Sequence, residues 1–226
     1  MSEIKERPII FSGEMIRAIL DDRKTQTRRV IKPQPGVGVV AQSVYPRPDG
    51  RYCWVLDATG VALSEPFGCP FGKPGDMLWV KETWADVNSE SGPALLYRSD
   101  GFMHFCADDA YPVEYERYPN CQFTMWCTDL VYREQRGCKS DHKWRSPIHM
   151  PRWASRIQLR ITDVRVERVK DISEGDAYHE GVVLPEPELQ TYYGEFKRLW
   201  ESINGKKHPW WHNDWVWVVE FERIAV

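Results

Sequence analysis

Two long segments of alternating apolar residues near the C-terminal end of the chain constrain its fold most strongly. One alternates from Ile157 through Leu159 and Ile161. The other, "DWVWVVEFERI", places large apolar residues at every second position: Trp215, Trp217, Val219 and Phe221. A period of two indicates β-strands that bury one face. The sequence therefore predicts two long strands, at 157–169 and 215–223.

A third strand is predicted at 77–81, directly after "GKPGD". Pro74-Gly75 fits the central pair of a type II turn, because proline presets φ and glycine accepts a positive φ. Asp76 is interpreted as a turn residue. We expect the three strands to lie in one barrel-like sheet.

Three segments show the signals of helices. In "FSGEMIRAILDDRK", Ser12 is a plausible N-cap before an apolar face. In "DISEGDAYHEGV", Ser173 can cap a short helix with Asp176 at the third helical position, and Gly181 can end it. The clearest helix spans 189–203, and we expect it to pack on the sheet through Phe196, Leu199 and Trp200.

The order of these elements is helix, strand, several strands, two helices, strand. That order favours an α+β fold with a mostly antiparallel sheet or small barrel over a doubly wound one. The chain has 226 residues, a length that suits one large domain. It contains no G-x-G-x-x-G, Walker, G-x-S-x-G or H-E-x-x-H motif, so several common enzyme classes fall away.

Charge and cysteine content set further limits. The net charge of −3 gives no global electrostatic reason to bind nucleic acid, but residues 143–170 are basic and residues 86–141 acidic. No apolar stretch approaches the ~18 residues of a membrane span, so we expect a cytosolic protein that meets no membrane. The six cysteines then read as reduced thiols, and none forms a C-x-x-C pair. His104 and Cys106 are the closest His/Cys couple, and no metal or cofactor is expected.

Three stretches in order, "ILDDRKTQTRR", "GKPGDMLWV" and "WVWVVEF", resemble the ASCH domain, a PUA-like β-barrel associated with RNA. "RPIIFSGEMIRAIL", "GDMLWVKETWA", "SPIHMPRWASRI" and "DISEGDAYHEGV" are similar to longer ASCH proteins of phages and prophages. The resemblance covers 7–31, 72–85, 146–183 and 189–223. It implies a single domain, 1–226, with flanking helices on a mixed barrel and β-rich insertions at 32–70 and 86–145.

The resemblance also implies a site. In small bacterial ASCH proteins that are N4-acetylcytidine amidohydrolases, a lysine and a threonine of the "RKTxT" block act with a glutamate of the later helix. Lys24, Thr27 and Glu180 stand at these positions. Two assignments are open: neutral Lys24 deprotonates Thr27, or Glu180 is the base and the Lys24 cation steadies the oxyanion. Lys24 must lie in the turn before the strand for the side chains to converge, because strand residues three apart face opposite sides.

Basic and aromatic residues elsewhere predict contacts with phosphates and bases. The predicted nucleoside- or RNA-binding residues are Arg23, Arg28, His149, Arg152, Trp153, Arg156, Trp210 and Trp211. Trp153 could instead pack in the core, and the loop 206–212 could instead plug one end of the barrel.

The leading hypothesis is thus a hydrolase that removes an acyl group from a modified cytidine. One alternative is a non-catalytic module that binds RNA or a modified base, and another is a ribonuclease. The oligomeric state is not specified by the sequence.

Overall fold

The computed structural model of the protein describes residues 4–35, 43–55, 64–89, 92–105, 124–125, 143–185 and 190–224. The strands are β1 (Glu6–Ile10), β2 (Gln26–Val30), β3 (Ser43–Pro46), β4 (Tyr52–Val55), β5 (Met77–Lys81), β6 (Trp84–Ser89), β7 (Gly92–Tyr97), β8 (Met103–Phe105), β9 (Thr124–Met125), β10 (Gln158–Arg168) and β11 (Trp215–Ile224). The helices are α1 (Gly13–Leu20), α3 (Glu174–His179) and α4 (Tyr192–Asn204), with 3₁₀ turns η2 (Pro147–His149), η3 (Arg152–Ala154), η4 (Val169–Asp171) and η5 (Trp210–His212).

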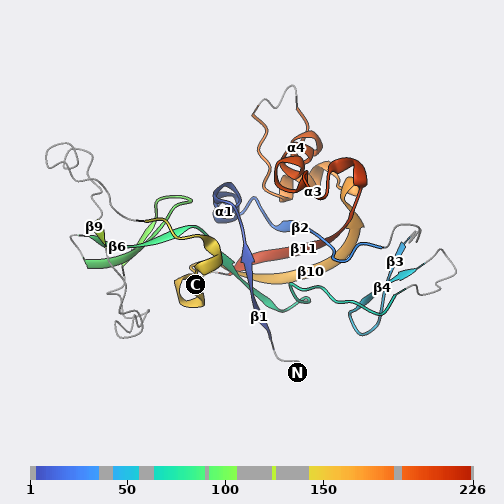
Figure 1. Ribbon diagram of the computed structural model, residues 1–226, viewed down its shortest axis with the longest axis horizontal. Helices are drawn as coiled ribbons and strands as arrows, with labels where there is room; N and C mark the ends of the chain where they lie inside the picture. Colours follow the sequence, from blue (N-terminus) through green and yellow to red (C-terminus); the bar gives the residue numbers. More distant parts are fainter. Residues whose placement is uncertain are drawn as a thin grey trace. The chain divides into compact units, whose positions relative to one another are not determined.

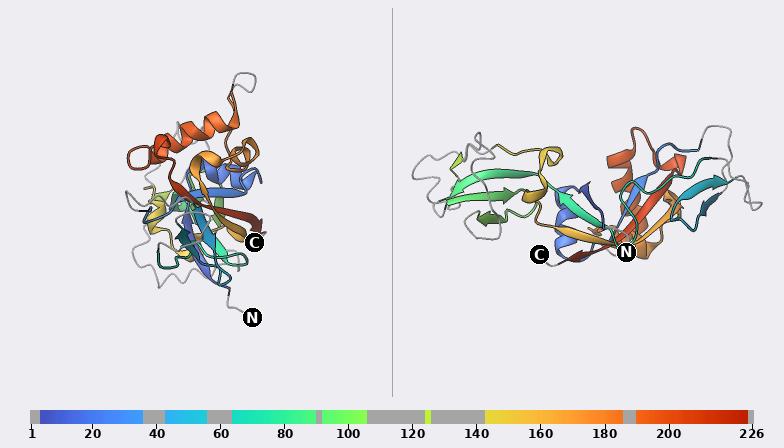
Figure 2. Two further views of the ribbon diagram at one scale, coloured as in Figure 1. Left: turned by 90° about the vertical axis from the view of Figure 1, so that its right-hand side faces the viewer. Right: turned by 90° about the horizontal axis from the view of Figure 1, so that it is seen from below.

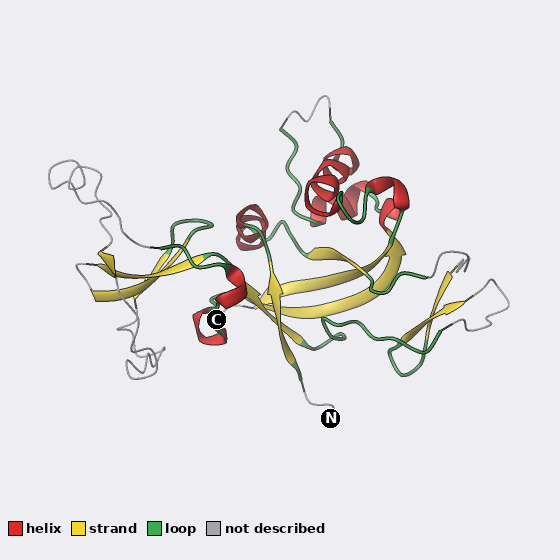
Figure 3. Cartoon of the chain, viewed as in Figure 1, coloured by secondary structure: helices red, strands yellow, loops and turns green. Residues whose placement is uncertain are grey.

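Strands make up most of the regular structure, and the predicted α+β class is confirmed (Figure 3). The strands form a five-stranded sheet of order β1-β5-β10-β11-β2, a two-stranded sheet of β3 and β4, and a four-stranded sheet of order β8-β7-β6-β9. Among the described residues none of these sheets closes on itself, so the expected barrel is not seen there. No helix in the described ranges is long and apolar enough to cross a membrane.

The chain divides into two compact units. Unit 1 comprises residues 1–7, 18–78 and 158–226, and unit 2 comprises residues 8–17 and 79–157. The insertion predicted at 32–70 falls in unit 1, and the one predicted at 86–145 falls in unit 2.

The five-stranded sheet brings together the three strands expected from the sequence. β5, β10 and β11 are neighbours in it, which confirms that prediction. β10 and β11 lie side by side (Figures 1 and 2). They run antiparallel from the pair Arg168–Trp215 to the pair Gln158–Ile224, with a bulge in the ladder near Asp163. β2 pairs antiparallel with β11 on the opposite side from β10, between Val30–Val216 and Gln26–Glu220.

Helices α3 and α4 lie over one face of β11 (Figure 1). Phe196 and Trp200 of α4 are buried in a cluster with Val216 and Val218 of β11, and Leu199 packs against it. The predicted packing of this helix is therefore confirmed. Alternate residues of β11 thus point to the helices, as expected for a strand that has a period of two.

The other face of β11 carries an aromatic cluster. The Trp217 ring lies 5.1 Å from that of Tyr52 and 5.8 Å from that of Phe67. The Trp215 ring lies 5.7 Å from that of Trp54. Residues of the predicted insertion 32–70 therefore cover the second face of the strand, which explains why β11 is buried on both sides.

Unit 2 has its own core. Trp84, Leu95, Tyr97, Met150 and Ala154 form a buried cluster. β7 pairs antiparallel with β6 and β8, and β9 pairs parallel with β6.

Candidate active site

The basic stretch after α1 is held against the end of α3. The chain turns at Asp22, whose φ is 55°, and the Lys24 amide donates to the Ala18 carbonyl at 3.0 Å. The Thr25 amide then donates to the His179 carbonyl at 2.9 Å. Lys24 therefore lies in the turn that precedes β2, as the convergence of its side chain with the later helix required.

Lys24 and Glu180 form a buried ion pair. Lys24 is 2% exposed and Glu180 3% exposed. The Lys24 Nζ donates to Glu180 Oε2 at 2.8 Å, to the Glu180 carbonyl at 2.7 Å and to the Gln26 carbonyl at 2.8 Å. An ammonium has three donors, so all three are used here. This geometry fits the charged form of the lysine, which has no lone pair with which to accept a proton.

The local sequence of α3 positions Glu180. Ser173 and Asp176 form the predicted capping box, and Glu180 caps the C-terminus of the helix. Gly181 follows with φ 84°, and a Cβ there would lie 2.8 Å from Ala18 Cβ and 2.9 Å from Lys24 Cβ. Glycine is needed both for the positive φ and for the close approach.

Arg28 extends the ion pair into a network. Its Nη1 lies 3.3 Å from Glu180 Oε1, and its Nη2 lies 3.0 Å from Glu167 Oε2 and 3.4 Å from Asp176 Oδ2. The Arg28 side chain is 0% exposed. The structure thus corrects the prediction that Arg28 contacts nucleic acid, because its Nη1 and Nη2 groups serve carboxylates of the protein and the side chain is not exposed to solvent.

Burial changes the protonation equilibria of this site. It lowers the pKa of the Lys24 ammonium below its usual 10.5, while the Glu180 carboxylate opposes the shift without cancelling it. Burial also lowers the pKa of the Arg29 guanidinium. The neutral form of Lys24 is thus less unfavourable than that of a lysine in solvent.

Thr27 is buried on β2, but it faces away from this network. It pairs with Val219, whereas Arg28 pairs with Val218. Paired residues of antiparallel strands share a face, so Thr27 points to the side of Trp217 and the aromatic cluster, and Arg28 points to the side of α4. The hydroxyl is not among the groups described above that contact the Lys24 ammonium or the Glu180 carboxylate. Two of the three predicted catalytic residues are brought together.

The remaining predicted binding residues of unit 1 differ in their surroundings. Arg23 is half-buried and donates to Asp21 at 3.0 Å and to the Gly181 carbonyl at 3.4 Å. Trp210 is 6% exposed in the core beside α4, so the prediction that its ring stacks on a base is corrected. Trp211 is 73% exposed, which leaves its ring accessible.

In unit 2, His149 is exposed in η2, and Arg152 and Trp153 lie half-buried in η3. The Trp153 ring lies 6.1 Å from that of Trp84, so it packs on the core of unit 2. Arg156 is held by carboxylates: its Nε donates to Glu82 at 2.9 Å and its Nη1 to Asp100 at 2.8 Å. Its guanidinium is therefore engaged within the protein, contrary to the predicted phosphate contact.

Two carboxylates are buried with partners that the sequence analysis did not predict. Asp76 is 3% exposed and accepts from the Lys5 amide, the Lys73 amide and the Arg7 guanidinium. Glu82 is 2% exposed and accepts from Arg156 and from the Ser99 hydroxyl. The turn "PGD" signals Asp76, but no short motif links either residue to partners more than sixty positions away.

Within the described residues no group of three or more His, Cys, Asp or Glu side chains is arranged to hold a metal ion. Cys53 and Cys69 are free thiols. His104 lies in β8, but Cys106 and the other three cysteines lie outside the described residues.

Comparisons with known proteins identify no relative of this chain. No family model, no curated protein and no solved structure matches the chain.

Proposed function

We propose that the protein is a hydrolase that removes an acyl group from a modified cytidine, in a nucleoside or in RNA, with Lys24 and Glu180 at the centre of its site. The observation that carries the proposal is the buried contact between an ammonium and a carboxylate supplied by segments 156 positions apart. Taking two charges out of water is costly and contributes little net stability. Perturbed buried charges of this kind are common where proton transfer takes place.

The geometry favours one of the two assignments. Because all three donors of the Lys24 ammonium are engaged, the lysine acts as a cation, and Glu180 is the base. Because Lys24 and Glu180 are only 2% and 3% exposed, the reaction requires that the site open to water and substrate. Glu180 then takes a proton from water, and the hydroxide adds to the acyl carbon. The oxyanion that forms accepts a hydrogen bond from Lys24, which gives up one of its carbonyl acceptors. Glu180 then returns the proton to the exocyclic nitrogen of the cytosine, which leaves as the amine.

This assignment gives Thr27 no nucleophilic role. Its hydroxyl faces the aromatic cluster, so a water molecule is the simpler nucleophile. Thr27→Val should then keep turnover within a few-fold of wild type. If Thr27→Val is inactive and Thr27→Ser is active, the hydroxyl is the nucleophile and the assignment must be reversed.

A second candidate is a non-catalytic module that binds a modified base. The three hydrogen bonds of the Lys24 ammonium favour it, because a lysine whose donors are all engaged is well suited to a structural role. To act on a substrate, Lys24 would have to break one of these hydrogen bonds. The exposed ring of Trp211 offers a stacking surface for a base in either case.

The test is product release from N4-acetylcytidine, and from an RNA oligomer that contains it, measured by chromatography. Glu180→Gln should lower turnover by ~10²–10⁴, the usual cost of losing a positioned acid–base group. Glu82→Gln is the matched control, since Glu82 is an equally buried, ion-paired carboxylate of unit 2. Equal turnover by Glu180→Gln and wild type contradicts the assignment. Binding of both substrates by an inert wild type favours the module.

A further inference from the structure

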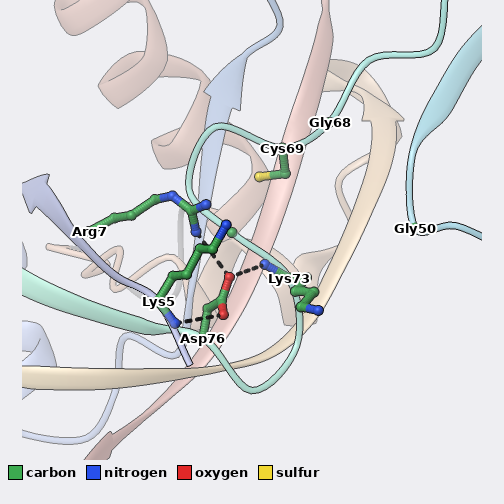
Figure 4. Close-up of a pocket in the computed structure, with 8 residues that line it drawn as sticks. Lys5, Arg7, Gly50, Gly68, Cys69, Lys73 and Asp76 are labelled. Carbon is green, nitrogen blue, oxygen red and sulfur yellow. Dashed lines mark hydrogen bonds and ion pairs between the residues drawn. The ribbon is translucent and has the colours of Figure 1, made fainter. Parts of the chain in front are cut away.

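A cavity in unit 1 is lined by residues outside the Lys24–Glu180 network. It has a volume of about 480 Å³ and is lined by Lys5, Arg7, Gly50, Gly68, Cys69, Gly72, Lys73 and Asp76 (Figure 4). Three of its lining residues are cationic and one is anionic. The proposed hydrolase uses none of them, and the sequence analysis assigned only Asp76, as a turn residue.

The lone carboxylate is fully engaged by the protein. Asp76 Oδ1 accepts from the Lys5 amide at 3.1 Å, and Oδ2 accepts from the Lys73 amide at 3.2 Å and from Arg7 Nη1 at 3.0 Å. These hydrogen bonds hold the pKa of Asp76 below its usual value although burial opposes the shift. The ion pair with Arg7 therefore neutralises both charges, and it fixes the floor of the cavity.

What remains is two ammonium groups. Lys5 and Lys73 are exposed at the cavity, and within the described part of the chain neither side chain forms a hydrogen bond or ion pair. Cys69 adds no charge at neutral pH, because burial raises the pKa of its thiol. The net charge presented to a ligand is thus close to two positive charges.

Glycines leave the cavity wall open. Gly50, Gly68 and Gly72 line it, and no Cβ projects from them into the space. At Gly72, with φ 127°, a Cβ would lie 2.7 Å from Arg7 Nη1 and 2.8 Å from Asp76 Oδ2. Only glycine lets the loop pass over the Arg7–Asp76 pair, which keeps this floor in place.

We propose that this cavity binds a phosphomonoester dianion, which Lys5 and Lys73 hold over the floor formed by Arg7 and Asp76. A phosphomonoester carries about −1.5 to −2 charges at pH 7, which matches the two unpaired ammonium groups. A phosphodiester, with one charge, is the poorer match. Inorganic phosphate and the terminal phosphate of a nucleotide share the required chemistry. The proposal is independent of the hydrolase activity.

The test measures the alkylation of Cys69 by iodoacetamide at low ionic strength, followed by peptide mass spectrometry. Inorganic phosphate and methyl phosphate should slow the modification of Cys69 in a saturable manner, and dimethyl phosphate should need a severalfold higher concentration. Low ionic strength matters because salt screens exposed charges. Buried Cys53 reports any general loosening of the fold. A nucleoside 5′-phosphate in a further arm distinguishes a nucleotide from the free ion by its tighter protection.

Substitutions of Lys5 and Lys73 test whether these two side chains bind the phosphate that protects Cys69. Lys5→Ala and Lys73→Ala should each raise the half-protecting phosphate concentration about fivefold, as expected for one charge at ~4 Å in water. Lys5→Arg and Lys73→Arg should keep it near wild type. Lys197→Ala, which removes an exposed lysine of α4 outside the cavity, is the matched control. Absence of protection, or equal protection in Lys73→Ala and Lys197→Ala, overturns the proposal.

Discussion

Each unit of the chain buries a glutamate beside a cation, and the two clusters solve the same electrostatic problem in different ways. In unit 2, Arg156 forks onto Glu82 at 2.9 and 3.1 Å, and its guanidinium lies 4.2 Å from the centroid of the Tyr97 ring. In unit 1, the Lys24 ammonium donates one hydrogen bond to the Glu180 carboxylate and two to backbone carbonyls. A guanidinium stays charged in proteins, whereas a buried lysine can change its charge.

The pKa values of the two cations move in opposite directions. Burial lowers that of Arg156, but its hydrogen bonds to Glu82 and Asp100 outweigh burial and raise it. Burial lowers that of Lys24, and Glu180 does not restore it. The charge of Arg156 is therefore fixed, whereas Lys24 loses its charge at a lower pH than a lysine in solvent.

The largest expected effect separates the clusters by stability. Lys24→Met removes the partner at 2.8 Å and leaves Glu180 buried with the longer contact to Arg28, and breaking a buried pair in this way typically costs ~3–5 kcal/mol. Arg156→Met should cost less, ~1.5–3 kcal/mol, because Glu82 keeps the Ser99 hydroxyl and Arg156 is partly exposed. The measurement is urea-induced unfolding of both variants at pH 7.

A double variant sharpens this comparison. Lys24→Met combined with Glu180→Met removes both charges, and apolar residues of similar size often replace a buried pair without loss. The double variant should be more stable than Lys24→Met alone. If it is less stable, the two side chains do not act as a pair in unfolding.

A smaller effect is expected at the glycine that lets the Lys24–Glu180 cluster form. Gly181→Ala meets both a positive φ and the close Cβ atoms of Ala18 and Lys24, and we expect a loss of ~2–4 kcal/mol in unfolding free energy. Gly75→Ala is the matched control, because its φ is 92° and nothing lies within 4 Å of the added Cβ. It should lose only the ~1–2 kcal/mol of backbone strain. Equal losses would mean that the close approach to Lys24 contributes nothing.

The sequence predicts the framework of unit 1 well, because its signals are local. Alternation identifies β10 and β11, and the Ser173 capping box and Gly181 delimit α3. The same local signals place Lys24 in a turn and Glu180 at a helix end. Their contact follows from the resemblance to a family, since no period in the sequence links positions that far apart.

The sequence could not show on which face of the sheet each side chain lies, or which residue forms the ion pair with each charged side chain. Thr27 and Arg28 are neighbours, yet the register of β2 against β11 sends them to opposite faces. Arg156 sits in a basic loop that suggests phosphate contacts, but Glu82 and Asp100 engage it from distant segments. Such pairings depend on tertiary structure, and a search for charge patterns along the chain misses them.

The smallest expected effect is a difference in pH dependence between the clusters. Because folding lowers the pKa of Lys24, the unfolded chain binds more protons at this site between the folded pKa and the usual 10.5. The unfolding free energy should therefore rise with pH in that window through Lys24, by at most ~1.4 kcal/mol per pH unit, and be flat below it. Tyr52 and Cys69, whose pKa values burial raises, contribute the opposite slope in every variant.

The informative quantity is thus the wild-type slope from pH 7 to 10.5 minus that of Lys24→Met, and it should be positive. Arg156→Met should leave the slope unchanged, because the already high pKa of Arg156 is raised further and lies outside this window. A wild-type slope equal to that of Lys24→Met would make the lysine a fixed cation like the arginine, and the distinction between the clusters would be lost.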